Sequence, residues 1–526
     1  MKKPLFERFP RLPSILTWAI YAFGVVIRWF YITRWHDPRK YVYSDMAMYT
    51  GLARRLAKPG YIVNIGDITH PPGFTWLLMF FQRLDPGLQG QVYCNFVVCA
   101  LLPLAVGALG WVTLGKRTGQ GSVVLASLYF AFIDYGGYFL AEIHIAFVAT
   151  LTFALYLAAM KLADREPTRR RTAGFIVVAA LGGFLFSVAM ALKMVAMPAV
   201  LGFCALHLLF SRTPKLRNRA AVLAVFLFAA APLTAKLVHR CTVANEGHFC
   251  SGSNKSAADF LLGHYGRIES IEWRDPGTPG LVVALGSPAA YQHGYRKKET
   301  VPFLITNQKK NAEFAWKWIG DHKAEAFVLS IEHVWDCFGG SYPWPSNSTG
   351  VWPGSYLCHY LFLFVVIFPA LVLLVDVLRK RGLLGLLRSV ELLIVSPIIG
   401  VCVAVFVASG ETRYRIPWDG VFIVLAVELY RRTPLRLGEV KEAAIPASNH
   451  HEEASPEGRG GESAGHHDHP GATDPGQLVA VDDGRGAVAA VAEPAGREAA
   501  AGAKQPLIEA GGADEEGHRE QEPERG

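Results

Sequence analysis

Long apolar segments recur along most of this chain, and they restrict its fold more than any other feature. A helix needs about 20 mostly apolar residues to cross the roughly 30 Å hydrocarbon core of a bilayer. Ten runs have this general character: 14–33, 92–114, 122–140, 142–162, 172–190, 194–210, 220–239, 355–378, 390–408 and 416–430. We therefore predict an all-α, polytopic membrane protein with about ten transmembrane helices. The chain is 51% hydrophobic and 18% charged, which excludes an ordinary soluble protein of several domains.

Basic clusters between the runs predict the orientation. They lie at 116–117, 161–171, 212–219, 379–388 and 431–432. If every run crosses once, these clusters share the side of the N-terminus, and basic loops mark the cytoplasmic side. The loop 34–91 then lies outside and the C-terminus lies in the cytoplasm. Because the basic residues belong to these loops, the formal net charge of +8 does not indicate nucleic acid as a partner.

The spacing of the runs predicts four regions. Residues 1–239 form an N-terminal transmembrane module, whose outer loop 34–91 carries juxtamembrane helices. Residues 240–354 are too long for a structureless loop and form a small extracytoplasmic cap. Residues 355–432 return to the membrane as the last helices.

The C-terminal region, 433–526, has a different composition. From residue 441 on it lacks aromatic residues and carries 18 acidic and 7 basic residues. Such a segment cannot bury enough apolar surface to offset its loss of conformational entropy. We predict a disordered cytoplasmic tail with solvated histidines.

The eight cysteines show no CxxC spacing and no Cys/His metal motif. Cys241, Cys250, Cys337 and Cys358 flank or lie in the predicted cap. If the cap faces an oxidising compartment, Cys241 with Cys250 is the candidate disulfide, although connectivity cannot be read from sequence.

Four short motifs resemble the glycosyltransferase C superfamily, in particular the bacterial relatives of protein O-mannosyltransferases and of lipid A aminoarabinose transferase (family 39 type). They are SDMAMY at 44–49, THPPGF at 69–74, LAEIHI at 140–145 and ETRYRIP at 411–417. The resemblance implies a multi-pass enzyme of the bacterial plasma (inner) membrane. It implies that the enzyme takes a sugar from a polyprenyl-phosphate donor outside the cytoplasm and passes it to a lipid, polysaccharide or protein acceptor. Membrane lipids would be its other partners.

The resemblance assigns Asp45 the role of general base, which takes the proton from the acceptor hydroxyl. A carboxylate in a partly dry cleft has its pKa raised towards the working range, and a positioned base contributes about 10²- to 10⁴-fold. The structural alternative is that Asp45 caps a helix starting at Met46. The family more often has two adjacent acidic residues, and Ser44 stands where the first would be. The division of labour among Asp45, Asp67 and Glu142 therefore stays open.

Other residues of these motifs are candidates for substrate contact. His70 precedes two prolines, which make a rigid corner, and is a candidate to touch donor phosphate or acceptor, as is Tyr49. Glu142 lies at the outer end of an apolar run, where an ionisable residue is costly unless it faces a polar cleft. It contacts acceptor or a divalent metal, or forms a hydrogen bond between helices. No cofactor is certain, and no P-loop, GxGxxG or HExxH motif indicates a nucleotide or zinc enzyme.

Three cations on the predicted outer side run against the local charge rule: Lys193, Arg413 and Arg415. The leaving group of the implied reaction is a lipid phosphate, whose developing charge needs fixed cations. An arginine guanidinium suits phosphate oxygens in a bidentate geometry. We predict that these residues bind donor phosphate. The alternative is that they reach towards lipid headgroups.

The first functional hypothesis is an inverting glycosyltransferase, because one displacement with a single base inverts the anomeric carbon. The second is a transporter or flippase of lipid-linked sugar, although we find no internal repeat of the kind that transporters show. The third is a non-catalytic member of the same fold, which the missing second acidic residue makes credible.

Overall fold

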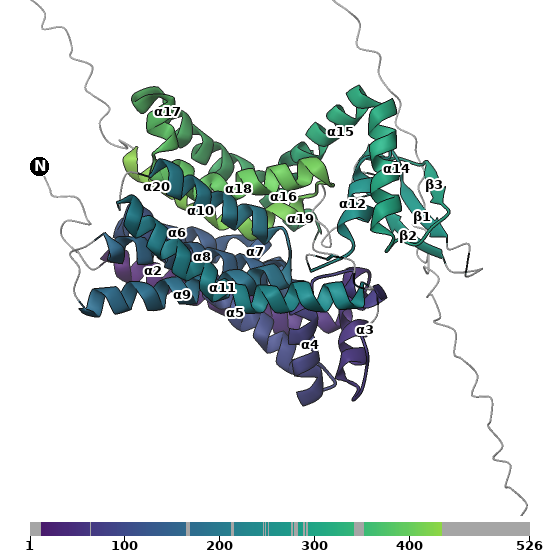
Figure 1. Ribbon diagram of the computed structural model, residues 1–526. Coiled ribbons are helices and arrows are strands. Elements are labelled where there is room, and N and C mark those ends of the chain that lie inside the picture. Colours follow the sequence, from purple (N-terminus) through teal and green to yellow (C-terminus); the bar gives the residue numbers. More distant parts are fainter. Residues whose placement is uncertain are drawn as a thin grey trace, which may run out of the picture. The chain divides into compact units, whose positions relative to one another are not determined.

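The computed structural model describes residues 12–433 except 64, 165–168, 212–214, 246, 248, 251, 275–276, 278–281, 288–289, 291–292 and 341–351. The predicted tail lies outside the described residues from 434 on. Within the described part the chain is mainly helical, as predicted, and the apolar helices form one continuous hydrophobic core. Figure 1 shows the order of the elements.

The elements of the helical bundle have the following bounds. The first half contains α2 (Leu12–Phe30), η1 (Tyr31–Trp35), α3 (Asp45–Ala57), η3 (Ile65–Ile68), α4 (Gly73–Leu84), α5 (Gln89–Leu114), α6 (Lys116–Leu128), α7 (Phe130–Asp134), α8 (Glu142–Ala163), α9 (Arg169–Leu192), α10 (Ala196–Phe210) and α11 (Leu216–Ala244). The second half contains η5 (Asp336–Gly340), α16 (Trp352–Phe362), η7 (Leu363–Ile367), α17 (Phe368–Leu387), α18 (Val390–Val407), α19 (Thr412–Arg415), η8 (Ile416–Trp418) and α20 (Asp419–Arg432).

Seven described helices are long and apolar enough to cross a membrane, against the ten predicted. They span Pro13–Lys40, Gln89–Leu114, Glu142–Ala163, Arg171–Leu192, Leu216–Ala244, Pro353–Leu387 and Val390–Val407. The other three predicted runs correspond to the shorter helices α6, α10 and α20, which have 13, 15 and 14 residues. These helices are shorter than the roughly 20 residues that a straight crossing needs.

The predicted run 122–140 is interrupted at Tyr129, whose backbone is extended between α6 and α7. The break leaves carbonyl groups at the end of α6 without helical partners. Arg28 of α2, which is 1% exposed, donates to the carbonyl oxygens of Ala126 and Ser127 at 3.0 and 2.7 Å. The Tyr129 hydroxyl donates to Asp419 of α20 at 2.6 Å. Contacts with distant helices therefore stabilise the break.

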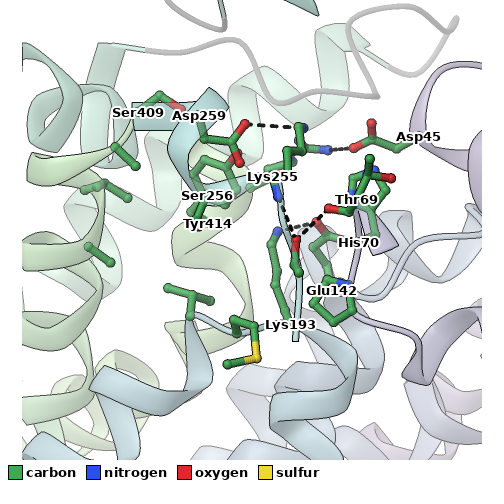
Figure 2. A pocket seen from close by; sticks show the side chains of 18 of the residues that line it. Asp45, Thr69, His70, Glu142, Lys193, Lys255, Ser256, Asp259, Ser409 and Tyr414 are labelled. Carbon is green, nitrogen blue, oxygen red and sulfur yellow. Dashed lines mark hydrogen bonds and ion pairs between the residues drawn. The ribbon is translucent and has the colours of Figure 1, made fainter. Parts of the chain in front are cut away.

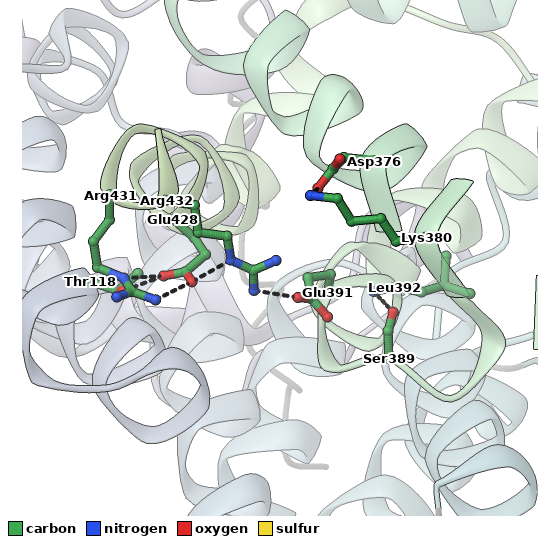
Figure 3. Close-up of polar contacts among 9 residues, drawn as sticks. All are labelled: Thr118, Asp376, Lys380, Ser389, Glu391, Leu392, Glu428, Arg431 and Arg432. Atoms are coloured by element: carbon green, nitrogen blue, oxygen red, sulfur yellow. Dashed lines mark hydrogen bonds and ion pairs between the residues drawn. The ribbon is translucent and has the colours of Figure 1, made fainter. Parts of the chain in front are cut away.

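A network of charged side chains joins α6, α18 and α20 (Figure 3). Glu428, which is 1% exposed, accepts hydrogen bonds from Arg431, Arg432 and Thr118. Arg432 also donates to Glu391 at 2.6 Å. Because both buried carboxylates have cationic partners, the network ties three helix ends together without leaving an unpaired buried charge.

Residues 256–335, which we call the insert, lie in the predicted cap region and contain a small sheet that the sequence analysis did not predict. The elements are α12 (Ser256–Gly263), β1 (Ser270–Arg274), β2 (Val282–Gly286), β3 (Lys298–Val301), α14 (Gln308–Asp321) and α15 (Lys323–Trp335). The strand order is β2-β1-β3, with β1 antiparallel to β2 and parallel to β3. Trp273 is 1% exposed, belongs to the insert's own core and donates to Asn311 of α14 at 2.8 Å.

Two glycines allow the insert to pack closely on the bundle. A Cβ at Gly263 would lie 1.6 Å from the carbonyl oxygen of Ala408, and one at Gly410 would lie 1.7 Å from that of His333. We expect Gly410→Ala to destabilise the protein by about 1–3 kcal/mol, because two backbones must move apart. Thermal unfolding measures the loss, and limited proteolysis should show an insert that is cut more readily. The control is Gly320→Ala in α14. A Cβ at this position would have no neighbouring atom within 4 Å, and alanine should stabilise the helix.

Candidate active site

A cavity of about 310 Å³ brings together segments that are far apart in the sequence. Its walls come from the start of α3, the turn before α4, the start of α8, the junction between α9 and α10, the start of the insert, and the end of α18 with α19. Figure 2 shows Asp45, His70, Glu142, Lys193, Lys255 and Asp259 around it. Six sequence candidates line this cavity: Asp45, Tyr49, His70, Glu142, Lys193 and Arg413.

Asp45 is the first residue of α3 and does not precede the helix as a cap would. The residue before it, Ser44, has a φ of 47° and forms no side-chain capping hydrogen bond. One carboxylate oxygen of Asp45 accepts from Nη1 of Arg413 at 2.8 Å. This contact joins residues 368 positions apart. The strained backbone at Ser44 costs free energy that the surrounding structure must supply, which is common at functional sites.

The pKa of Asp45 is lower than its ordinary value, opposite to the sequence expectation. Burial pushes the pKa upward, but the positive charges of Arg413 and Lys255 oppose burial and lower it. The expectation considered the dry cleft and not the cation 2.8 Å away. Asp45 is therefore ionised throughout the physiological range.

Two further ion pairs border the cavity. Lys193, just after α9, donates to Glu142 at the start of α8 at 3.0 Å, and its ammonium also lies 4.5 Å from the ring centre of Tyr414. Lys255, just before α12, pairs with Asp259 at 3.4 Å. With Asp45 and Arg413, the cavity thus has three carboxylates, each paired with one cation.

The sequence analysis missed Lys255 and Asp259. Lys255 is a cation in a region predicted to lie outside, so the rule that singled out Lys193 could also have found it. Asp259 is four residues later on the first turn of α12, the spacing at which helical side chains meet. The resemblance did not extend to this segment.

His70 lies in the turn that leads into α4. Two prolines and Gly73 follow it. A Cβ at Gly73 would lie 2.6 Å from the backbone of Ala191, so this turn packs closely against the end of α9. The His70 ring lies 5.0 Å from the ring of Tyr49, and its Nε2 is buried without a hydrogen-bond partner among the described residues. Burial and the charge of Lys255 lower the pKa of His70 to about 4. The imidazole is therefore neutral at physiological pH.

Two predicted site residues lie outside the cavity. Asp67 accepts from Arg55 at 2.9 Å and from the Tyr61 hydroxyl at 2.7 Å. Arg415 is fully buried and pairs with Asp419 at 2.8 Å. Residues two apart on a helix do not share a face, so α19 directs Arg413 into the cavity and Arg415 into the bundle.

Arg415 also anchors α19 to η5, a segment of the same chain. Its guanidinium donates to the carbonyl oxygens of Cys337 and Phe338 at 3.1 and 3.3 Å. Arg415 therefore holds α19 in place, and Arg413 is the arginine of this helix that lines the cavity. Across the described ranges, no group of three or more histidine, cysteine or acidic residues could hold a metal ion.

The low pKa of His70 predicts a pH dependence of stability. Between about pH 6.5 and about pH 4 the unfolded chain binds a proton at this residue and the folded chain does not, so the free energy of unfolding falls as the pH is lowered. Between about pH 7 and about pH 5 the melting temperature of the wild type should therefore fall more than that of His70→Asn. His239→Asn, at an exposed position of α11, serves as the control and should behave like the wild type. Equal pH dependence in the wild type and His70→Asn would contradict the prediction.

Comparisons with known proteins give structural neighbours. No family model and no curated protein sequence matches the chain. The archaeal oligosaccharyltransferase AglB from Archaeoglobus fulgidus, in complex with an inhibitory peptide and a dolichol-phosphate, is 12% identical with a TM-score of 0.45, over 85% of this chain and 53% of that one. An Archaeoglobus fulgidus oligosaccharyltransferase in complex with Zn and sulfate is 13% identical with a TM-score of 0.43, over 78% of this chain and 49% of that one.

A bacterial neighbour is ArnT from Cupriavidus metallidurans bound to undecaprenyl phosphate. It is 15% identical with a TM-score of 0.42, over 82% of this chain and 61% of that one. This chain spans between about half and three-fifths of the length of these neighbours.

Proposed function

We propose that this protein is an inverting membrane glycosyltransferase that transfers a sugar from a polyprenyl-phosphate donor to an acceptor hydroxyl. The observation that carries the proposal is the contact between Asp45 and Arg413 in a cavity that also contains Lys193. A base for the acceptor and cations for the leaving phosphate thus lie together. The class of donor comes from the motif resemblance.

The walls of the cavity suit a donor with a charged head and an apolar tail. Much of the apolar lining comes from the first turn of α10 with the residues before it and from the end of α18: Met194, Val195, Pro198, Ala404, Val405 and Ala408. These two helices pack closely, since a Cβ at Gly400 of α18 would lie 2.8 Å from Ala199 of α10. The charged part, with Arg413 and Lys193, would hold the phosphate.

The proposed reaction is a single displacement. The acceptor oxygen attacks the anomeric carbon, its proton passes to Asp45, and the bond between that carbon and the phosphate oxygen breaks. The lipid phosphate leaves with the electron pair, and Arg413 and Lys193 stabilise its charge. The acceptor forms its bond on the face opposite the phosphate, so the anomeric configuration inverts.

The ion pair adds a coupling between donor binding and base strength. A carboxylate whose pKa is held low by a cation is a weak base. A donor phosphate competes with Asp45 for Arg413, and its negative charge opposes the effect of the cation. Donor binding therefore raises the pKa of Asp45 when the acceptor is due to react.

Purified protein in proteoliposomes with a labelled polyprenyl-phosphate sugar tests the function. Lipid, polysaccharide and peptide acceptors are supplied in separate reactions, and protein-free vesicles are the control. Labelled product with inverted configuration supports the proposal. Movement of intact donor across the bilayer without product would indicate a transporter, and neither activity would indicate a non-catalytic protein.

A further inference from the structure

We infer that Lys255 is a third phosphate-binding cation of this site and that the Cys241–Cys250 disulfide positions it. The inference rests on the proposed function, because it names a further part of the same donor site. It makes donor affinity dependent on a covalent bond outside the cavity. The argument follows the chain from the disulfide to the lysine.

The disulfide ties Cys250 back to the last turn of α11, and the two cysteines pack against the first outer loop. Cys241 lies in the last turn of α11, and both cysteines are 2% exposed. They form a small hydrophobic cluster with Ile68 of η3, which is 1% exposed. The Cys250 N–H also donates to the Thr242 hydroxyl at 3.2 Å. The chain that enters the insert is therefore held against the loop that carries His70.

Hydrogen bonds continue this attachment as far as Lys255. The Asn254 N–H donates to the carbonyl oxygen of Ile68 at 2.9 Å, and the Ser253 hydroxyl donates to that of Thr69 at 2.6 Å. The Lys255 N–H then donates to the Ser253 hydroxyl at 3.2 Å. These contacts fix the backbone of Lys255 beside the residue that precedes His70. Only five positions separate Lys255 from Cys250.

The side chain of Lys255 lies in the cavity and also interacts electrostatically with Asp45 and His70. It lines the cavity and is 18% exposed, with Asp259 at 3.4 Å as its ion-pair partner. Its charge contributes to the low pKa of both Asp45 and His70. The three cations of the cavity thus come from three elements, and an anion between them could contact all three by exchanging carboxylate partners. Phosphate, with several acceptor oxygens, is the group that uses such an arrangement best.

A double-mutant cycle on the full chain in nanodiscs tests the inference. The probes are farnesyl phosphate, inorganic phosphate and the neutral lipid farnesol. We expect Lys255→Met to weaken farnesyl phosphate binding by about tenfold or more, since it removes a hydrogen bond to a charged group. The double variant Cys241→Ser/Cys250→Ser should weaken it similarly, and the triple variant should be no weaker than either. Farnesol binding should not change in any of them.

Controls separate positioning from general stability. Lys309→Met, at an 87% exposed lysine of α14, should retain wild-type affinity. Ser253→Ala removes the bond to Thr69 and leaves the disulfide intact, so it tests the same attachment even if the cysteine variant does not fold. Lys255→Met could lose affinity equally for inorganic and farnesyl phosphate, or for farnesyl phosphate alone. Both results support phosphate recognition. The first assigns Lys255 to phosphate on any carrier and the second to a lipid phosphate.

Two results would overturn the inference. Unchanged farnesyl phosphate affinity in Lys255→Met would remove the cation from the site. Additive losses in the triple variant would mean that the disulfide acts through overall stability and not through Lys255. The proposed function fails separately, through absence of transfer in the proteoliposome assay, which does not depend on the result of this binding cycle.

Discussion

Asp45→Asn is expected to abolish sugar transfer, with a loss of about 10²- to 10⁴-fold in turnover. Asparagine has the same shape, and its carbonyl oxygen can still accept the hydrogen bond that Arg413 donates at 2.8 Å. It cannot take a proton from the acceptor. Protein level and melting temperature should stay near those of the wild type, because Arg413 keeps Glu411 as an ion-pair partner. Farnesyl phosphate affinity should not fall, because the phosphate no longer competes with a carboxylate at position 45 for Arg413. Initial rates in proteoliposomes, normalised to folded protein, measure the effect.

Asp67→Asn is the matched control for this prediction. Asp67 lies in the same outer loop and also pairs with an arginine, Arg55 at 2.9 Å, but it does not line the cavity. Its substitution should lower stability, because its carboxylate is 2% exposed, and leave turnover per folded molecule unchanged. Full activity in Asp45→Asn would end the assignment of Asp45 as the base. Loss of turnover in both variants would leave the division of labour between these two acids open.

The fold was predictable where local hydrophobicity decides it. The apolar run 92–114 corresponds to Gln89–Leu114, and 390–408 corresponds to Val390–Val407, because an apolar segment of this length is stable as a helix in a bilayer or a large core. The run 122–140 was wrongly predicted as one continuous helix. Its break at Tyr129 is stabilised by Arg28 and Asp419, which lie far away in sequence. The insert's strands are only four or five residues long, too short to stand out from turn-rich sequence.

The candidate site was predictable as a set of motifs and not as a geometry. Motif order and predicted side of the membrane grouped Asp45, His70 and Arg413, which the structure brings to one cavity. The direction of the pKa shift at Asp45 depends on a partner 368 positions away, which no local pattern reveals. Arg415 was grouped with Arg413 because they are neighbours in sequence, although helical geometry sends them to different environments.

Arg413→Gln is expected to reduce kcat/KM by about 10²- to 10³-fold, because it removes a fixed cation from the leaving phosphate. It should also move the acid limb of the pH profile of kcat/KM to higher pH. In the wild type the charge of Arg413 opposes burial and keeps Asp45 ionised in acid. Without that charge, burial raises the pKa of Asp45, so protonation inactivates the base at a higher pH. Transfer rates measured across the acid range give both the loss of kcat/KM and the pH of the acid limb.

Two further variants make the Arg413 prediction specific. Arg413→Lys restores the positive charge and should return the acid limb towards that of the wild type, while donor affinity recovers only in part because lysine lacks the bidentate fork. Arg415→Gln leaves Asp419 buried without its cation, so it should lower stability and not move the acid limb of the folded fraction. An acid limb that stays in place in Arg413→Gln would mean that this arginine does not control the base. In that case donor binding could not raise the pKa of Asp45 by drawing Arg413 away, and the proposed coupling between phosphate and base would be lost.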